Sequence, residues 1–108
     1  MTPLAEQHCT SLHAGSPALD EDAAGELLAQ IPGWSIAGGT IVRDFTFSDF
    51  FGTMAFVNAL AWIAHREDHH PELVVGFDHC EVRYRTHSVG GLSVNDFICA
   101  AKIEALSA

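Results

Sequence analysis

The stretch from Ser48 to His70 constrains the fold more than any other part of the sequence, because it carries a helical pattern and ends against Pro71. Ser48 is a favourable N-cap residue, and Asp49 would lie in the first turn, where the helix dipole favours negative charge. Five apolar residues recur at helical spacing, namely Phe50, Met54, Val57, Ala61 and Ala64. Proline disfavours helical geometry in the residue before it. We therefore predict a core helix that ends at the histidines, followed by a strand.

Segments with the composition of strands flank this helix on both sides. Residues 34–36 and 41–47 alternate in polarity around a pair of glycines, which can take the positive φ of a tight turn. Residues 72–75 and 80–86 predict a second hairpin, with its turn at Asp78-His79. The long helix is thus expected to connect two β-hairpins.

Capping signals predict two further helices. Asp20 can cap a helix that ends at Pro32-Gly33, and Ser93 with Asp96 has the spacing of a capping box at the start of a last helix. The order is then helix, two strands, helix, two strands, helix. This order predicts an α+β fold, a four-stranded antiparallel sheet with three helices packed on one face.

The length and charge of the chain restrict its organisation and its partners. We predict one domain over residues 20–108, preceded by a flexible N-terminal arm over residues 1–19. With 14 acidic and 5 basic residues the net charge is -9, so we expect no nucleic acid as a partner. The most apolar stretch, residues 54–64, is shorter than the roughly 20 residues that cross a bilayer, so no membrane partner is expected either. The N-terminus lacks the pattern of a signal peptide, and we expect a cytoplasmic protein.

The three cysteines form an odd set without CxxC spacing. They predict neither a framework of disulfides nor a closed zinc site. We expect Cys80 and Cys99 to be small core residues, and Cys9 to lie in the arm, where it could be oxidised.

The histidines in the middle of the chain are the candidate functional residues. His69 and His70 lie at the negative end of the predicted helix beside Asp68, and both features favour an imidazolium that exchanges protons near neutral pH. With the turn at Asp78-His79, residues whose numbers sum to 157 lie opposite one another, so that His70 faces His87. A slip of one residue would put the two on opposite faces of the sheet.

Other interpretations of these residues remain open at this point. His65 and His69 have the spacing of a metal-binding pair, but the glutamate of a zincin helix is missing and no third ligand is indicated. His69 and His70 could instead cap the last carbonyls of the helix, and Asp96 could serve the capping box alone. Surface positions are the simplest interpretation of His65, His79 and His87.

Several motifs resemble those of the pterin-4a-carbinolamine dehydratase family. The most specific ones are Glu67-Asp68-His69-His70-Pro71-Glu72, Phe77, Thr86-His87, Gly91-Leu92-Ser93 and Asn95-Asp96-Phe97. Further similar segments are Ile31-Pro32-Gly33-Trp34, Phe45-Thr46-Phe47 and Phe56-Val57-Asn58. The resemblance extends over nearly the whole chain, and the leader resembles that of bacterial members.

This resemblance implies dehydration of 4a-hydroxytetrahydrobiopterin to quinonoid dihydropterin, which recycles the pterin cofactor of aromatic amino-acid hydroxylases without a metal or an organic cofactor. It also implies a homodimer or homotetramer. The implied catalytic residues are His69, His70 and His87, and the implied substrate-binding residues are Asp68, Pro71, Thr86 and Asp96. The departing hydroxyl needs a proton while a ring nitrogen must lose one, so we assign this acid and base work to His69 and His70. His87 would orient the pterin or share in proton transfer, and Asp96 would hold the loop after His87.

The sequence also departs from the family pattern. His65 stands where many members have an acidic residue, and Phe77 replaces a tyrosine or tryptophan. Arg83 and Arg85 lead to His87 on one face of the strand and could hold an anionic group or pair with surface acids. Some members of the family bind proteins, as a dimerisation cofactor of a nuclear transcription factor or as assembly factors for RuBisCO in carboxysomes. Binding of a protein client is therefore the alternative function.

Overall fold

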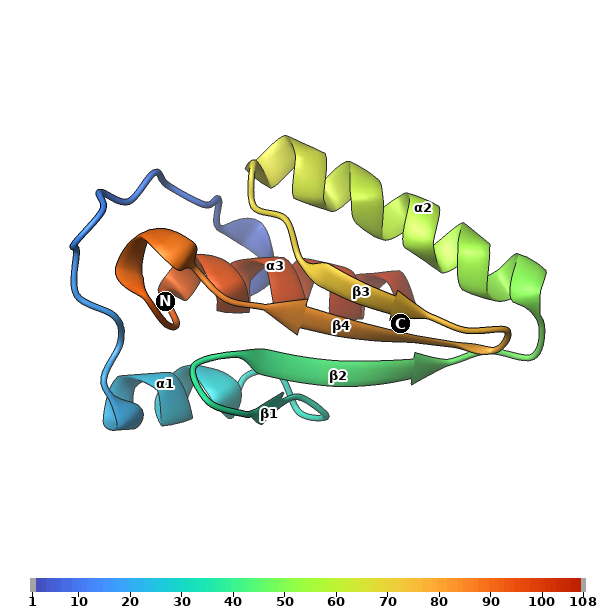
Figure 1. Ribbon diagram of the computed structural model, residues 1–108, viewed down its shortest axis with the longest axis horizontal. Helices are drawn as coiled ribbons and strands as arrows, with labels where there is room; N and C mark the ends of the chain where they lie inside the picture. The colour runs from blue at the N-terminus through green and yellow to red at the C-terminus, as the bar shows by residue number, and fades with distance from the viewer. Residues whose placement is uncertain (1, 108) are drawn as a thin grey trace.

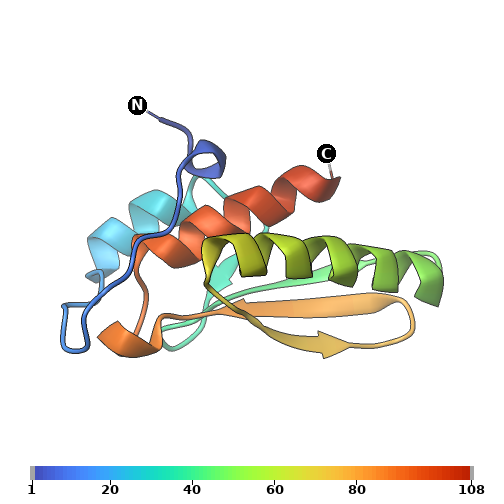
Figure 2. The same cartoon turned by 90° about the horizontal axis from the view of Figure 1, so that it is seen from above.

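The helices and strands follow one another in the predicted order in a computed structural model that describes residues 2–107. The elements are α1 (Glu21–Leu28), β1 (Ser35–Ile36), β2 (Ile41–Thr46), α2 (Phe50–Glu67), β3 (Glu72–Val75), β4 (His79–Tyr84) and α3 (Val94–Glu104). Neighbouring strands are antiparallel, in the order β1-β2-β4-β3. All three helices lie on one face of the sheet, as Figure 1 and Figure 2 show. The predicted α+β fold is confirmed.

Side-chain caps begin α1 and α3 as predicted. Asp20 Oδ1 accepts a hydrogen bond from the N–H of Ala23 at 2.8 Å. At α3, Ser93 and Asp96 form the capping box, in which Asp96 Oδ2 accepts from the N–H of Ser93 at 3.0 Å. Both carboxylates lie at the positive end of a helix dipole, where negative charge is stabilising.

The cap of α2 differs from the prediction by one residue. Asp49, not Ser48, is the N-cap, and its Oδ1 accepts from the N–H of Gly52 at 2.7 Å. Serine and aspartate are both good caps, but the carboxylate adds a favourable charge at the helix N-terminus. Two adjacent candidates of this kind cannot be separated by propensity alone.

The predicted apolar stripe of α2 is also wrong in phase, since only Ala64 of its five residues is buried. The buried residues are Thr53, Phe56, Leu60 and Ala64. Because α2 carries apolar residues on more than one side, its contacts with the sheet decide which side is buried. Phe56 packs on Phe45 with ring centroids 4.6 Å apart, and the Thr53 hydroxyl donates to the carbonyl of Phe77 at 3.0 Å.

None of the helices within residues 2–107 is long and apolar enough to cross a membrane.

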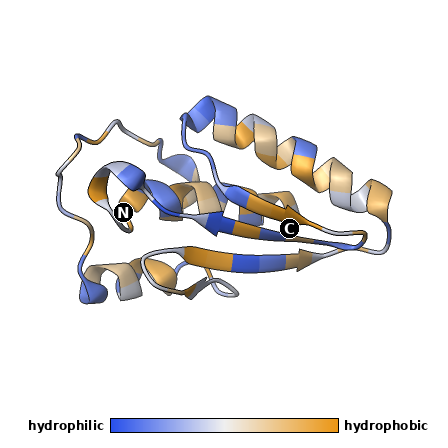
Figure 3. Cartoon of the chain, in the orientation of Figure 1, coloured by the Kyte–Doolittle hydropathy of each residue, from blue (hydrophilic) through white to orange (hydrophobic). Residues whose placement is uncertain are grey.

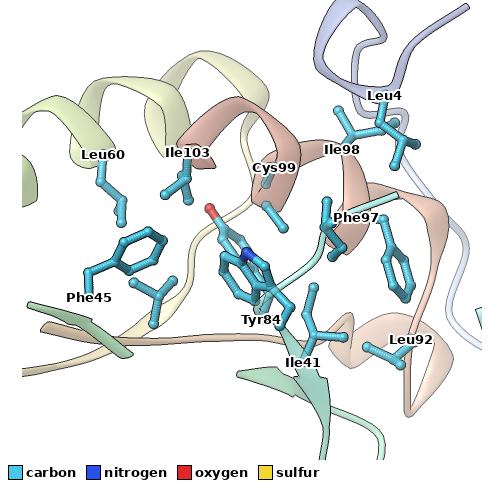
Figure 4. Packing of buried hydrophobic residues seen from close by; sticks show 14 of the residues in the cluster. Leu4, Ile41, Phe45, Leu60, Tyr84, Leu92, Phe97, Ile98, Cys99 and Ile103 are labelled. Atoms are coloured by element: carbon cyan, nitrogen blue, oxygen red, sulfur yellow. The ribbon is translucent and has the colours of Figure 1, made fainter. Parts of the chain in front are cut away.

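The core fills the space between the sheet and the helices. Figure 4 shows side chains of β2 and β4 meeting those of α2 and α3. The residues nearest its centre include Ile41, Phe45, Leu60, Tyr84, Phe97 and Ile103. Cys80 and Cys99 are fully buried, as predicted.

The turn between β3 and β4 lies one residue earlier than predicted, at Phe77-Asp78. Contacts from outside the hairpin hold it there. The Thr53 hydroxyl bonds to the carbonyl of Phe77, and the N–H of Phe47 donates to the carbonyl of Asp78 at 2.7 Å. These partners come from α2 and the end of β2, so the local sequence of the hairpin does not reveal them.

The earlier turn changes how the two strands pair. Glu72 lies opposite Arg83, and the same register would bring His70 opposite Arg85, so the predicted pairing of His70 with His87 is wrong. The pairing shifts by two residues, however, and side chains two apart share a face of a strand. His70 and His87 therefore still line one hollow together.

The N-terminal segment 2–19 lies along α3 and then crosses to α1 (Figure 2). Leu4 is buried at 4% exposure. The N–H of Thr10 donates to Asn95 Oδ1 at 3.1 Å, and Asn95 Nδ2 donates back to the carbonyl of Thr10 at 2.7 Å. The segment that we predicted to be a flexible arm thus has defined contacts, and its flexibility stays a prediction.

Candidate functional site

The site begins where α2 ends, at a residue with left-handed backbone geometry. Asp68 has φ 50° and ψ 43°, a conformation that aspartate tolerates better than most residues with a side chain. The helix thus stops at Glu67, before the histidines, and the N–H of His69 donates to the carbonyl of Ala64 at 3.1 Å. Figure 3 shows hydrophilic residues gathered at this end of α2. The left-handed residue turns the chain so that His69 and His70 lead into β3.

His69 is held by contacts on several sides. Its Nε2 lies 2.6 Å from Asp96 Oδ1, and its side chain is only 13% exposed. The imidazole stacks on the Tyr84 ring, with centroids 5.1 Å apart. The Tyr84 hydroxyl also donates to the backbone carbonyl of His69 at 3.1 Å. These contacts fix both the position of the ring and the nitrogen that faces Asp96.

Asp96 connects His69 to the loop between β4 and α3. It is fully buried, and its Oδ2 accepts from the Thr86 hydroxyl at 2.9 Å and from the N–H of Ser93 at 3.0 Å. The Thr86 and Ser93 hydroxyls are themselves 2.7 Å apart. One carboxylate therefore caps α3, ties down this loop and holds an imidazole.

The surroundings of His69 favour its protonated form. Burial lowers the pKa of the imidazole, but the hydrogen bond and the negative charge of Asp96 oppose that effect. The net result is a pKa above the usual value of a histidine. His69 therefore stays protonated to a higher pH than a histidine in water.

Two adjoining hollows open beside this pair, one of about 300 Å³ and one of about 160 Å³. The larger, which we call the histidine hollow, is lined by Asp68, His69, His70, Arg85, Thr86, His87 and Ser88. The smaller, the arginine hollow, is lined by Thr40, His70, Glu72, Arg83, Arg85 and His87. His70, Arg85 and His87 line both.

The predicted site residues fall into two groups. The structure brings His69, His70 and His87 together around the histidine hollow, with Asp68 and Thr86 beside them. Asp96 and Pro71 do not line either hollow: Asp96 lies behind His69, and Pro71 precedes β3. His87 itself begins a 3-10 turn, His87–Val89, rather than ending a strand.

Sequence reasoning missed two features of this site. Tyr84 was not singled out, although its alternation with Cys80 and Val82 along β4 signals a buried position. The direct bond between Asp96 and His69 was also missed, because a capping box shows where Asp96 lies in its own helix and not what reaches it from elsewhere.

The rival interpretations can be compared with the structure. Among residues 2–107, no three His, Cys, Asp or Glu side chains gather in a group that could hold a metal ion. His65 is exposed on α2, and the side chain of His79 is 42% exposed beside Asp78. The His69 ring bonds to Asp96 rather than to the last carbonyls of the helix.

The sequence matches the family described as "Pterin 4 alpha carbinolamine dehydratase" over residues 17–106. A protein of Nitrosospira multiformis named as a pterin-4-alpha-carbinolamine dehydratase is 50% identical over 103 residues, covering 95% of this chain and 91% of its own. A protein of Xanthomonas campestris pv. campestris with the same name is 56% identical over 108 residues, covering 98% of this chain and 92% of its own.

Solved structures share the fold. A transcriptional coactivator/pterin dehydratase from Brucella melitensis has a TM-score of 0.81 and 31% identity, and covers 84% of this chain and 99% of its own. A pterin dehydratase-like protein described as a RuBisCO assembly factor in the alpha-carboxysome has a TM-score of 0.57 at 21% identity, covering 68% of this chain and 86% of its own, a likeness of fold alone. By its sequence motifs, its family match and these relatives, the chain belongs to the pterin-4a-carbinolamine dehydratase family.

Proposed function

We propose that the protein dehydrates a 4a-hydroxytetrahydropterin to the quinonoid dihydropterin by acid and base catalysis in the histidine hollow. The observation that carries the proposal is the buried Asp96 bonded to His69 at 2.6 Å, beside a hollow that His69, His70 and His87 line together. Family membership supports the choice of a pterin as the substrate.

The two proton transfers suit different histidines. The C4a–O bond breaks as the hydroxyl receives a proton and leaves as water, and His69 is suited to supply that proton because Asp96 stabilises its protonated form. A ring nitrogen of the pterin loses a proton, and the exposed His70 is the base in our proposal. The transfers then balance, and solvent restores both imidazoles.

The remaining predicted residues take supporting parts in this proposal. His87 lines both hollows and would orient the pterin or share in the transfer. Asp68 and Thr86 lie on the wall of the histidine hollow and would contact the substrate. Asp96 would act through His69 as a positioning residue, and Pro71 through the direction that it gives the chain before β3.

The test is an assay of 4a-hydroxytetrahydropterin dehydration with the wild type, His70→Ala and a matched control, His65→Ala. We expect the His70 variant to lose roughly hundredfold or more in kcat, the size of a general acid or base contribution. His65 lies on the exposed side of α2, away from both hollows, and its removal should leave kcat unchanged. A wild type that is no faster than buffer would overturn the proposal.

A second candidate function, binding of a protein client, rests on the exposed face of α2. Phe51 is 84% exposed and Trp62 is 61% exposed, and aromatic side chains in such positions are typical of protein interfaces. Co-elution with RuBisCO in size-exclusion chromatography, by a protein without turnover, would favour this candidate.

The same face of α2 could instead pair two copies of the chain, and we propose self-association to a dimer or tetramer. We also propose a cytoplasmic location, because free cysteines suit a reducing compartment.

A further inference from the structure

We propose that the arginine hollow binds an anionic group, a phosphate or a carboxylate, on the side chain of the pterin substrate. Arg83 and Arg85 would be its ligands, while the reacting ring occupies the histidine hollow. The inference rests on the proposed function for the identity of the ring. It adds a class of substrate and two residues that select it.

The charge distribution is the first support. Only five residues are Lys or Arg in a chain of net charge -9, yet two of them line this one small hollow. Of the other three, Arg43 pairs with a carboxylate of α3, Lys102 lies near the Glu67 carboxylate, and Arg66 lies over the ring of Trp62. None of these three lines either hollow, whereas Arg83 and Arg85 line the arginine hollow together with His70 and His87.

The positions of the two arginines favour joint binding of one group. Arg83 lies in β4 and Arg85 follows directly after its end, and residues two apart on an extended chain point to the same side. His87, in the 3-10 turn that comes next, lines the same hollow. The guanidinium offers several N–H donors in a fixed plane, which suits carboxylate and phosphate oxygens. Two such groups on one wall can hold two oxygens of the same anion.

The existing contacts of the arginines leave room for such a ligand. Arg83 Nε donates to Glu81 Oε1 at 2.7 Å, but that pair is exposed, with the two side chains 46% and 34% accessible, so an anion can compete for it. Arg85 Nε is buried and has no hydrogen-bond partner within residues 2–107. Buried donors are nearly always bonded, so the protein leaves the guanidinium of Arg85, a residue that lines the hollow, unsatisfied at this nitrogen.

Glu72 is the one carboxylate on the wall of this hollow. It lies opposite Arg83 in the β3–β4 ladder, and it offsets one of the two positive charges. The side chains that line the hollow therefore carry one net positive charge, while Glu81, the partner of Arg83, lies outside this lining.

The shared wall relates the two hollows to the two ends of one substrate. His70, Arg85 and His87 line both, so the hollows adjoin at the residues proposed for catalysis. The reacting carbon and the side chain of a pterin lie on the same ring, and the side chain must leave the histidine hollow near that boundary. The arginine hollow is the adjoining space that is rich in positive charge.

The experiment compares 4a-hydroxytetrahydropterins that carry a neutral hydroxylated, a carboxylated or a phosphorylated side chain. For the wild type we expect kcat/KM to be about tenfold higher or more for an anionic side chain, the effect of one charge-assisted hydrogen bond. Arg83→Gln and Arg85→Gln should each reduce this ratio toward one. Arg66→Gln, a matched loss of charge outside both hollows, should keep the wild-type ratio. The preference should also weaken as salt is added.

The outcomes separate this inference from the proposed function. Preference for both anions supports a general anion site, and preference for one identifies it as a phosphate or a carboxylate site. Turnover of the neutral pterin without any anionic preference would overturn the inference and leave the dehydratase proposal standing. If no pterin is turned over, the dehydratase proposal fails, and fluorescence titration with an oxidised pterin, with and without a phosphate, decides the inference. Equal affinity for the two pterins would then overturn it.

Discussion

Asp96 holds both the start of a helix and the ring of His69. Its two oxygens have different partners, since Oδ1 faces the imidazole while Oδ2 accepts from Thr86 and Ser93. A buried carboxylate with this many hydrogen bonds is stabilising only while all of them are made. The same residue thereby couples the stability of α3 to the protonation of the site.

We predict that Asp96→Asn lowers the pKa of His69 toward the usual value, because the negative charge that opposes the effect of burial is removed. The free energy of unfolding should fall by about 1.5–3 kcal/mol, the contribution of a hydrogen bond to a charged group. NMR titration of the imidazole and urea unfolding measure the two effects.

Ser93→Ala is the matched control for that variant. It removes a partner from the same cap and should cost about 1 kcal/mol of stability, but it leaves the Asp96 charge beside His69. A lowered His69 pKa in this control as well would mean that loss of structure, rather than loss of charge, causes the shift.

The raised pKa of His69 also predicts how stability varies with pH. Since protonation of His69 is more favourable in the folded state, its contribution is full below the unfolded pKa of about 6.5 and is lost as the pH rises through the folded pKa. Urea unfolding of the wild type and His69→Gln at intervals between roughly pH 6 and 9 measures the difference. A difference that stays constant, or that grows with pH, would contradict the assignment.

For individual residues, the sequence predicts which side chains belong to the site better than it predicts which of them are hydrogen-bonded to each other. His69 and His70 stand out because Pro71 ends a helix beside them, and Asp96 because it completes a capping box. Which imidazole receives the carboxylate depends on the docking of α3 against the end of α2, a contact between segments 27 residues apart. Tyr84 escapes notice because a buried aromatic residue in a strand has the ordinary signature of a core residue.

For helices and strands too, the sequence predicts that an element exists better than it predicts how the element is placed, as α2 and the second hairpin show. Both exist because of strong local patterns, yet the phase of α2 and the turn at Phe77-Asp78 are set by tertiary partners. Thr53 contributes to both placements, because it lies on the buried side of α2 and its hydroxyl donates to the carbonyl of Phe77 in the hairpin turn. A polar residue on an otherwise apolar helix gives no sign of that partner in the sequence.

The end of α2 also anchors the N-terminal segment, through Glu67. Its carboxylate accepts from the N–H of Cys9 at 2.7 Å and lies 2.9 Å from His8 Nδ1 and 3.9 Å from Lys102 Nζ. Burial raises the pKa of this carboxyl, but these three partners outweigh burial and lower it overall. The anchor is therefore ionised at neutral pH.

We predict that Glu67→Gln speeds hydrogen exchange at the amide of Cys9, because a neutral side chain accepts a weaker hydrogen bond from this N–H than the carboxylate does. Exchange at the next amide, of Thr10, which donates to Asn95 Oδ1, should also speed up because the same segment loosens. Glu26→Gln, on the exposed side of α1, should leave these amides unchanged. The same loosening should occur in the wild type as the pH falls through the lowered pKa of Glu67, since the stabilisation is present above the unfolded pKa and lost below the folded one. Unchanged exchange at both amides in Glu67→Gln would show that the segment is held elsewhere.

At the scale of the molecule, two surfaces within residues 2–107 expose neighbouring apolar side chains. The outer side of α2 presents Phe51, Ala55 and Trp62, which are four and then seven residues apart and so lie on one side of the helix. β3, an edge strand of the sheet, leaves Val74 55% and Val75 42% exposed. Exposed helical stripes and open strand edges are the surfaces through which copies of a chain pair.

We therefore expect sedimentation to detect a dimer or a tetramer. Phe51→Asp and Trp62→Asp should each shift the equilibrium toward the monomer, because a carboxylate would be buried without a partner. Ile36→Asp, on the opposite edge strand, is the matched control and should keep the assembly. A monomeric wild type at the concentrations used in the activity assay would contradict this expectation.

The contacts of the N-terminal segment join residues that are farther apart in the sequence than the contacts of the site do, so they close a longer loop of chain. His69 and Asp96 are 27 residues apart, and Thr10 and Asn95 are 85 apart. The longer closure costs about 1 kcal/mol more in chain entropy. We expect the histidines to be in place early in folding, within the region between α2 and α3. Residues 2–19 should dock last and be the first to detach.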